Sequence, residues 1–167
     1  AEGRPFQGCL YFGLMLTPDG PKVIEYNCRF GDPETQVVLP LLRSDLLEIM
    51  LAVREGRLAQ TPVEFAGGAA CCVVMASAGY PLKYETGFPI RFPAQLDDLH
   101  AEIYCAGVRT EDGVPVTSGG RVLGVTATAE DLPEAIRRAY AAVARTDFEN
   151  AYYRHDIGKR ALAAMEE

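Results

Sequence analysis

Three polar residues at alternate positions of one predicted strand are the first candidates for chemistry: Glu25, Asn27 and Arg29. Because successive side chains of a strand point to opposite faces, these three share one face. Magnesium takes oxygen ligands and needs only one or two from protein when phosphates and water supply the rest, so Glu25 and Asn27 predict half of a metal–nucleotide site. The guanidinium of Arg29 suits a carboxylate or a transferring phosphoryl group. A solvated strand face is the plainer interpretation of the same pattern.

Two acidic residues follow this row at the start of a predicted helix. Asp32 fits the N-cap, Pro33 the first helical position and Glu34 the first turn. A cap contributes about 1 kcal/mol and needs only one acidic residue. The second acid, placed directly after the polar row, therefore favours a reaction site over capping alone.

A hairpin must hold the polar row in place. Residues 9–17 are apolar and aromatic, residues 18–21 (PDGP) are a turn signal, and residues 22–27 form the return strand. The helix that starts at Asp32 is expected to falter near Pro40, because proline cannot donate a helical hydrogen bond.

A second helix is predicted to start at Ser44, with Glu48 near the capping-box position and Gly56 at its end. Beyond a boundary near residues 60–63 the chain changes to short strands with frequent glycine and proline. The strands are expected at 69–77, 102–108, 113–117 and 122–128, followed by an amphipathic helix over 131–145 and a short terminal helix from about Asp156.

A glycine loop in this second half could bind an anion. Gly119 and Gly120 allow close approach of the backbone to a ligand, and Arg121 adds a positive charge. A plain hairpin turn explains Ser118, Gly119 and Gly120 equally well, so both interpretations stay open.

Composition excludes some classes of partner. The net charge of −7 argues against a general nucleic-acid surface, and no apolar run reaches the ~20 residues that a membrane helix needs. The five cysteines are scattered and odd in number, which predicts buried, reduced thiols in a cytoplasmic protein. A zinc site is disfavoured because His100 and His155 lie far from paired cysteines.

Four segments together resemble the phosphoribosylamine–glycine ligases, which are ATP-grasp enzymes of purine synthesis. Residues 25–36 (EYNCRFGDPETQ) resemble the late motif of that family. Residues 44–46 (SDL), 117–126 (TSGGRVLGVT) and 152–158 (YYRHDIG) agree with it at the expected distances. The resemblance covers nearly the whole chain, and these motifs are specific in combination.

The resemblance implies an ATP-dependent ligation of glycine to 5-phosphoribosylamine by way of a glycyl phosphate. By position, Glu25 and Asn27 match the ligands of Mg²⁺ or Mn²⁺, and Arg29 matches the catalytic residue that steadies the acyl phosphate. Asp32 falls where related enzymes contact the substrate, and Gly120 with Arg121 falls near the ribose phosphate.

The implied fold is α+β: the end of an ATP-grasp domain, an antiparallel hairpin plus helices, followed by a small β-rich domain with a flanking helix. We expect the first part at residues 1–61 and the second, barrel-sandwich-like part at 62–167. An ATP-grasp enzyme also needs an N-terminal substrate domain, phosphate-binding lysines and a glycine-rich loop, and only 24 residues precede Glu25. We therefore expect a C-terminal part that is inactive alone and has the missing N-terminal part as its partner.

Two other functions compete with this interpretation. One is a sister ATP-grasp enzyme, such as the folate-independent glycinamide ribonucleotide formyl-transfer enzyme or a carboxylase of aminoimidazole ribonucleotide. The segment 31–36 (GDPETQ) argues against it. The other is a non-catalytic, carrier-like or partner-binding module, for which Lys83 is the one lysine of the β-rich part before the tail.

Overall fold

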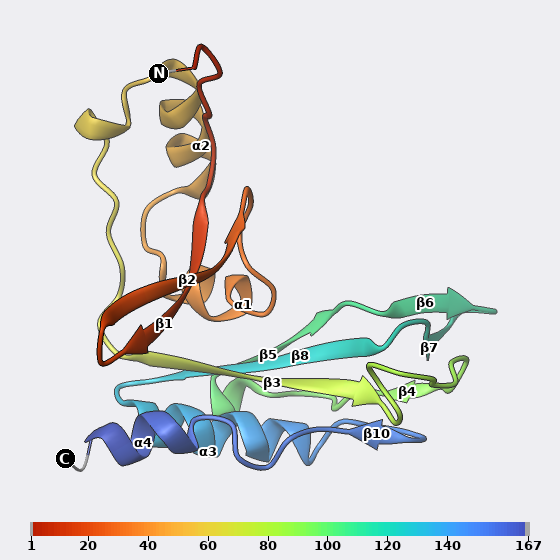
Figure 1. Cartoon of the computed structure of the whole chain (residues 1–167). Helices are drawn as coiled ribbons and strands as arrows, with labels where there is room; N and C mark the ends of the chain where they lie inside the picture. The colour runs from red at the N-terminus through yellow and green to blue at the C-terminus, as the bar shows by residue number, and fades with distance from the viewer. Residues whose placement is uncertain (1, 166–167) are drawn as a thin grey trace. The chain divides into compact units, whose positions relative to one another are not determined.

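The computed structural model describes residues 2–165, and the chain divides into two compact units (Figure 1). Unit 1 comprises Ala1–Thr35 and Leu42–Ala66, and unit 2 comprises Gln36–Leu41 and Gly67–Glu167. These units differ from the predicted domains 1–61 and 62–167, because the short segment Gln36–Leu41 packs with the second half of the chain. Each unit is described separately below.

The predicted hairpin is the first element of unit 1. Strand β1 (Tyr11–Thr17) pairs antiparallel with β2 (Gly20–Asn27), and the register shifts by one residue between Gly13 and Leu14. The turn is closed by Thr17, whose hydroxyl donates to the Gly20 carbonyl at 2.7 Å. Gly20 has a φ of 95°, a conformation that glycine adopts without steric cost.

The helix predicted to start at Asp32 begins later and is shorter. Helix α1 (Thr35–Val38) is followed directly by the 3₁₀ turn η1 (Leu39–Leu41), as the predicted interruption at Pro40 requires. Asp32 and Pro33 lie in a turn ahead of α1, which begins only at Thr35, so the predicted N-cap role of Asp32 is wrong. The chain is anchored instead at Thr35, whose amide donates to the Gly31 carbonyl at 3.2 Å.

Helix α2 (Leu46–Glu55) has a different cap from the predicted one. Asp45, not Ser44, is the N-cap, and its carboxylate accepts from the amides of Leu47 at 2.8 Å and Glu48 at 3.1 Å. Ser44 instead accepts from the amide of Glu64 at 2.8 Å. The predicted end at Gly56 is confirmed, with a left-handed φ of 72°.

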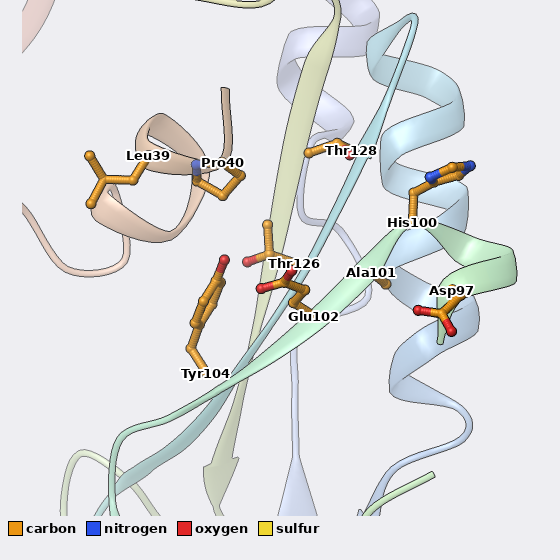
Figure 2. Close-up of a pocket in the computed structure, with 9 residues that line it drawn as sticks. All are labelled: Leu39, Pro40, Asp97, His100, Ala101, Glu102, Tyr104, Thr126 and Thr128. Carbon is orange, nitrogen blue, oxygen red and sulfur yellow. The ribbon is translucent and has the colours of Figure 1, made fainter. Parts of the chain in front are cut away.

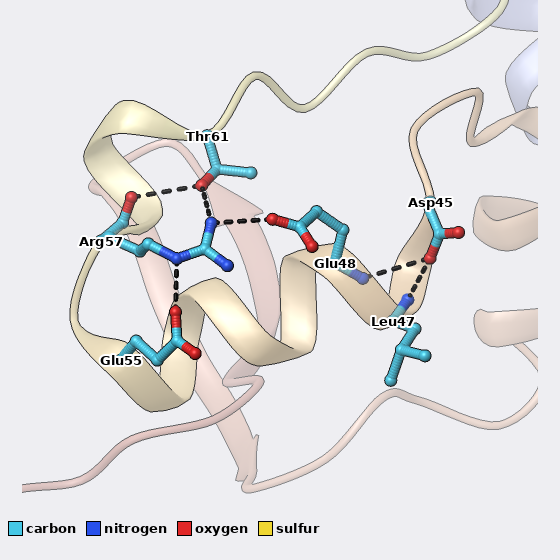
Figure 3. A network of polar contacts seen from close by, with 6 residues as sticks. All are labelled: Asp45, Leu47, Glu48, Glu55, Arg57 and Thr61. Atoms are coloured by element: carbon cyan, nitrogen blue, oxygen red, sulfur yellow. Dashed lines mark hydrogen bonds and ion pairs between the residues drawn. The ribbon is translucent and has the colours of Figure 1, made fainter.

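Arg57 links helix α2 to the segment that follows it (Figure 3). Its guanidinium contacts Glu48 at 2.8 Å and Glu55 at 2.5 Å, and it also donates to the Thr61 hydroxyl at 3.3 Å. Thr61 follows the 3₁₀ turn η2 (Leu58–Gln60). These groups are about half exposed, so solvent screens the ion pairs and their main effect is to hold the chain after α2 against the helix.

Unit 2 is built on a four-stranded antiparallel sheet in the order β10-β3-β8-β5. Its strands are β3 (Ala69–Ser77), β5 (Ala101–Cys105), β8 (Arg121–Ala129) and β10 (Ala151–Tyr152). Helix α3 (Leu132–Val143) packs along one face of β3 and β8 (Figure 1). The described strands of this sheet thus form one antiparallel layer with a helix along one face.

Smaller elements border this sheet. They are β4 (Ile90–Arg91) paired with β9 (Asp147–Phe148), β6 (Val108–Glu111) paired with β7 (Val114–Thr117), the 3₁₀ turn η3 (Asp97–Leu99) and α4 (Lys159–Met165). The predicted strand 102–108 is broken at Gly107. A Cβ at Gly107 would lie 2.6 Å from the Arg121 carbonyl oxygen, so the chain crosses β8 there at a distance that only glycine permits.

The apolar core lies almost entirely in unit 2. Side chains from β3, β8 and α3 form it, with Met75, Leu123, Val73 and Val125 among the largest fully buried ones. Among the described residues of unit 1, Ala52 is the one buried hydrophobic residue, while most of the exposed large hydrophobic side chains belong to that unit. Unit 1 therefore lacks a hydrophobic core of its own.

The cysteine prediction is only partly correct. Cys71 and Cys72 are buried on β3, and desolvation raises the pKa of Cys71 to about 11. Cys28 and Cys105 are exposed, contrary to the prediction, because each lies at the end of a strand rather than within it. Within residues 2–165 no helix is long and apolar enough to cross a membrane.

We predict that stability depends on the two units unequally. Leu123→Ala removes a side chain that is 1% exposed and should lower the free energy of unfolding of unit 2 by about 2–5 kcal/mol. The matched control Leu16→Ala removes a leucine that is 84% exposed and should leave that transition unchanged. Urea unfolding of both variants is the measurement, and equal losses would contradict the assignment of the core.

Candidate functional site

Glu25 and Asn27 lie side by side on the hairpin. The amide nitrogen of Asn27 donates to a carboxylate oxygen of Glu25 at 3.0 Å. The register of β2 on β1 places Glu25 opposite Gly13 and Asn27 opposite Tyr11. The two predicted side chains are therefore brought into contact on the hairpin.

Gly13 makes room for Glu25. A Cβ on Gly13 would lie 2.9 Å from the Cγ of Glu25, so the Glu25 side chain extends across β1 at the position where the glycine has no side chain. Gly13 was not among the predicted site residues. Its signal was present, since Gly13 interrupts an otherwise bulky strand opposite the most polar residue of the return strand.

Tyr11 holds a second carboxylate, that of Glu34, in this region. Its hydroxyl donates to Glu34 at 3.1 Å, and this hydrogen bond raises the pKa of Tyr11, with smaller contributions from burial and from the charges of Glu34 and Glu25. The phenol therefore stays protonated and acts as a donor at neutral pH. Glu34 also folds back against Gly31, where a Cβ would overlap its carboxylate.

Arg29 and Asp32 belong to the same unit as this pair. The guanidinium of Arg29 donates to the neighbouring carbonyl of Phe30 at 2.8 Å. Asp32 is exposed in the turn that precedes α1. The side chain of Arg29 is thus exposed and bonded to the backbone of the next residue.

The donor set fits a metal ion only in part. Within residues 2–165 no group of three or more His, Cys, Asp and Glu side chains could hold a metal. Glu25 and Asn27 offer one carboxylate and one amide oxygen, which suits a cation whose other ligands are phosphate oxygens and water. Binding would require the Asn27 amide to turn its carbonyl oxygen toward the ion. The residues present therefore fit a divalent ion that arrives with a nucleotide.

Gly120 and Arg121 form a separate set in unit 2. The carbonyl of Gly120 accepts from the Ser77 amide at 2.8 Å, and the Ser77 hydroxyl donates to the Gly119 carbonyl at 2.9 Å. A Cβ at Gly120 would lie 2.1 Å from the ring of Tyr80. Gly120 is buried, so packing against Tyr80 is enough to explain why a glycine is needed there. A role for the loop in phosphate binding therefore depends on Arg121.

A cleft that sequence reasoning missed lies on the sheet face opposite α3 (Figure 2). Its volume is about 610 Å³, and its lining consists of Leu39, Pro40, Asp97, His100, Ala101, Glu102, Tyr104, Thr126 and Thr128. Burial, with a smaller effect of Glu102, raises the pKa of Tyr104. The buried hydroxyl of Thr126 has no hydrogen-bond partner among the described residues. Among the described residues that line this cleft there is no Lys or Arg, so its chemistry does not suit a phosphate group.

Comparison with known families decides the class of protein. Residues 70–160 match the family described as "Phosphoribosylglycinamide synthetase, C domain", and residues 1–35 match "Phosphoribosylglycinamide synthetase, ATP-grasp (A) domain". The chain belongs to the phosphoribosylglycinamide synthetase family. The predicted family is therefore confirmed, as is the prediction of an ATP-grasp end followed by a C-terminal domain.

Curated relatives and a solved structure agree with the family. The phosphoribosylamine–glycine ligase of Chlorobaculum tepidum is 52% identical over 97% of this chain, and the trifunctional purine biosynthetic protein adenosine-3 of Gallus gallus is 52% identical over 98%. The crystal structure of the Thermotoga maritima phosphoribosylamine–glycine ligase is 41% identical, with a TM-score of 0.77 over 89% of this chain. This chain spans 38%, 16% and 36% of those three proteins, respectively.

The two sets of candidate residues fall in the two matched regions of the phosphoribosylglycinamide synthetase family. Glu25, Asn27, Arg29 and Asp32 lie in the ATP-grasp match, whereas Gly120 and Arg121 lie in the C-domain match. The relatives named above also disfavour the sister ATP-grasp enzymes as an alternative. Their names do not assign a role to any residue, so the roles stay predictions.

We predict that Gly120 is intolerant of a side chain. Gly120→Ala forces the Tyr80 ring or the loop to move and should cost about 1–3 kcal/mol of unfolding free energy, the usual effect of overpacking. Gly67→Ala is the matched control, because a Cβ there meets nothing within 4 Å. Denaturant unfolding compares the two variants, and a Gly120→Ala protein as stable as the control would refute the packing role.

Proposed function

We propose that this chain is the C-terminal part of a phosphoribosylamine–glycine ligase and contributes part of the ATP and metal site. The observation that carries the proposal is the Glu25–Asn27 pair, joined at 3.0 Å within the segment that matches the ATP-grasp domain. The cytoplasmic location expected from the cysteines belongs to the same proposal.

The proposed reaction has two steps. A carboxylate oxygen of glycine attacks the γ-phosphorus of ATP, which forms glycyl phosphate and releases ADP. The amine of 5-phosphoribosylamine then attacks the carbonyl carbon, phosphate leaves, and the nitrogen loses a proton to give glycinamide ribonucleotide. Both steps gather negative charge on phosphoryl oxygens, so a site for them needs cations and oriented donors.

The residues of unit 1 suit the first of these steps. Glu25 and Asn27 would hold a divalent ion, Mg²⁺ or Mn²⁺, which supplies neutralisation of the phosphate charge when it is bound. Arg29 presents a guanidinium whose planar donors match a carboxylate or an acyl phosphate. The hydrogen bond to the Phe30 carbonyl uses one nitrogen of the exposed Arg29 guanidinium, and the other nitrogens would be offered to a substrate.

The remaining candidates suit recognition of phosphoribosylamine. Arg121 offers a permanent positive charge for the ribose phosphate, next to the Gly120 backbone. Asp32 offers an acceptor for the incoming amine or for a ribose hydroxyl. The phosphate-binding lysines and the glycine-rich loop of an ATP-grasp enzyme would come from the N-terminal part of such a ligase, which is the proposed partner of this chain.

We predict activity only when the chain is joined to that part. In the test, the region of the Chlorobaculum tepidum ligase that matches this chain is replaced by this chain. The chimera should form ADP and glycinamide ribonucleotide from ATP, glycine and phosphoribosylamine, whereas the chain alone should not. Robust turnover by the chain alone would refute the proposal that it is only part of a ligase. A folded but inactive chimera would refute the proposed activity.

We predict that Glu25 and Asn27 set the metal requirement of this chimera. Glu25→Gln and Asn27→Ala should each raise the Mg²⁺ concentration at half-maximal rate by about tenfold or more, the effect of roughly 1.4 kcal/mol of lost metal binding. Lys22→Gln is the control, since Lys22 is exposed on the same strand but lies outside the pair. Metal-activation curves make the comparison, and identical curves for all three variants would remove the metal assignment.

A further inference from the structure

The cleft of Figure 2 has the size of a small-molecule site and no part in the proposed reaction. Its volume of about 610 Å³ falls within the roughly 300–1,000 Å³ that is usual for ligand pockets. All of its described lining residues belong to unit 2, and neither the Glu25–Asn27 pair nor Arg121 is among them. We call it the acidic cleft, after Asp97 and Glu102 in its wall.

Strand β8 places an unpartnered hydroxyl in the acidic cleft. Val125 and Ala127 lie in the core with α3, so Thr126 between them points to the opposite face of the sheet. The strand register sets Thr126 directly opposite Glu102 of β5. Thr126 is 3% exposed, and its hydroxyl has no hydrogen-bond partner among the described residues. Buried hydroxyls are normally hydrogen-bonded, and a donor on a ligand would supply the missing partner.

The two carboxylates in the wall also lack a counter-ion. Neither Asp97 nor Glu102 forms an ion pair with a described residue. The adjacent Asp98 differs, because Arg145 donates to both of its carboxylate oxygens at 2.8 and 2.7 Å. Tyr104 adds a hydroxyl that stays protonated at neutral pH, because burial and then the charge of Glu102 raise its pKa. The cleft thus offers acceptors and negative charge.

We propose that the acidic cleft binds an aliphatic diamine, with one ammonium group at Glu102 and Thr126 and the other at Asp97. An ammonium group has three N–H donors and no acceptor, which matches a wall of carboxylate and hydroxyl oxygens. Figure 2 shows Asp97 and Glu102 apart from one another along the cleft, with Ala101 between them. The two carboxylates therefore suit two separate ammonium groups, and Ala101 offers apolar surface to the methylene groups that join them.

Other classes of ligand fit the acidic cleft less well. A phosphate or carboxylate ligand would face two carboxylates without a described Lys or Arg in the lining to offset them. A bare metal ion would lack ligands, since within residues 2–165 no group of three or more His, Cys, Asp and Glu side chains could hold one. A neutral alcohol or sugar would bond to Thr126 but leave both carboxylates without a counter-ion.

Isothermal titration of this chain with putrescine and the longer diamine cadaverine tests the inference without reference to ligase activity. At least one of them should bind at a single site. The matched control is n-butylamine, which has the carbon chain of putrescine but one ammonium group, and it should bind about tenfold more weakly or worse. No binding of either diamine up to about 10 mM, or equal affinity for n-butylamine, would refute the proposal.

Substitutions separate the acidic cleft from the general negative charge of the chain. Glu102→Gln and Asp97→Asn should each weaken binding of the diamine by about tenfold, since each removes the counter-ion of one ammonium group. Glu149→Gln is the matched control, because it removes the same charge at an exposed position of unit 2 outside the cleft. Equal losses in all three variants would mean that the attraction is nonspecific, and the site would be rejected.

Thr126→Val distinguishes a ligand contact from a structural role. Valine keeps the shape of threonine and removes the unpartnered hydroxyl, so the melting temperature of the ligand-free chain should stay the same or rise. Binding of the diamine should weaken by about fivefold, the usual effect of one lost hydrogen bond. A variant that melts lower but binds the diamine as tightly as the unchanged chain would contradict the assignment of Thr126 to the ligand.

The Chlorobaculum chimera described above decides whether the acidic cleft stays open in the longer protein. The folded chimera should bind the diamine with the affinity of the chain alone. Binding that is lost in the chimera would mean that the N-terminal part fills the cleft, which would overturn the inference. An inactive chimera that still binds the diamine would reject the proposed function and keep the site, so the two proposals fail separately.

Discussion

The contact of α3 with β3 and β8 is the interaction on which the rest of unit 2 depends. The helix buries a row of small residues, with Ala135, Ala139 and Ala142 each fully buried. Small side chains let a helix lie close to a sheet, and the bulk of the core then comes from the strands. Val73 and Val125 are also fully buried, in register with one another. With one face fixed in this way, the other face is free to hold Gln36–Leu41 and the polar cleft beside that segment.

The two candidate sets thus rest on different supports. Arg121 begins a strand that is anchored along its length by two neighbours and by a helix. Glu25 and Asn27 sit on a hairpin with one pairing and almost no core. The proposed metal ligands would need to be held in a precise place, and a two-stranded hairpin with almost no core gives them little rigidity. This difference explains physically why the chain is expected to need a partner before it can act.

Sequence reasoning recovered the elements that strong periodic or turn signals define. The hairpin, β3, β8 and α3 were predictable because alternation, PDGP and the helical period are local properties. The cap of α2 was misplaced by one residue, since Ser44 and Asp45 are both good caps and a tertiary contact of Ser44 with Glu64 decides between them. The break at Gly107 depends on a strand crossing that no local pattern reveals.

The contact between Glu25 and Asn27 could be predicted from the sequence, but the residues that surround them could not. Glu25 and Asn27 meet because alternate strand residues share a face, whereas Gly13 and the Tyr11–Glu34 hydrogen bond depend on register and on a turn. The cleft around Thr126 joins elements far apart in the sequence. The aromatic ring beside Gly120 has a consequence for sequence change in this chain: positions 80 and 120 are coupled. A side chain at 120 fits more easily once the ring at 80 has been replaced by something smaller, so a change at 80 favours a later change at 120.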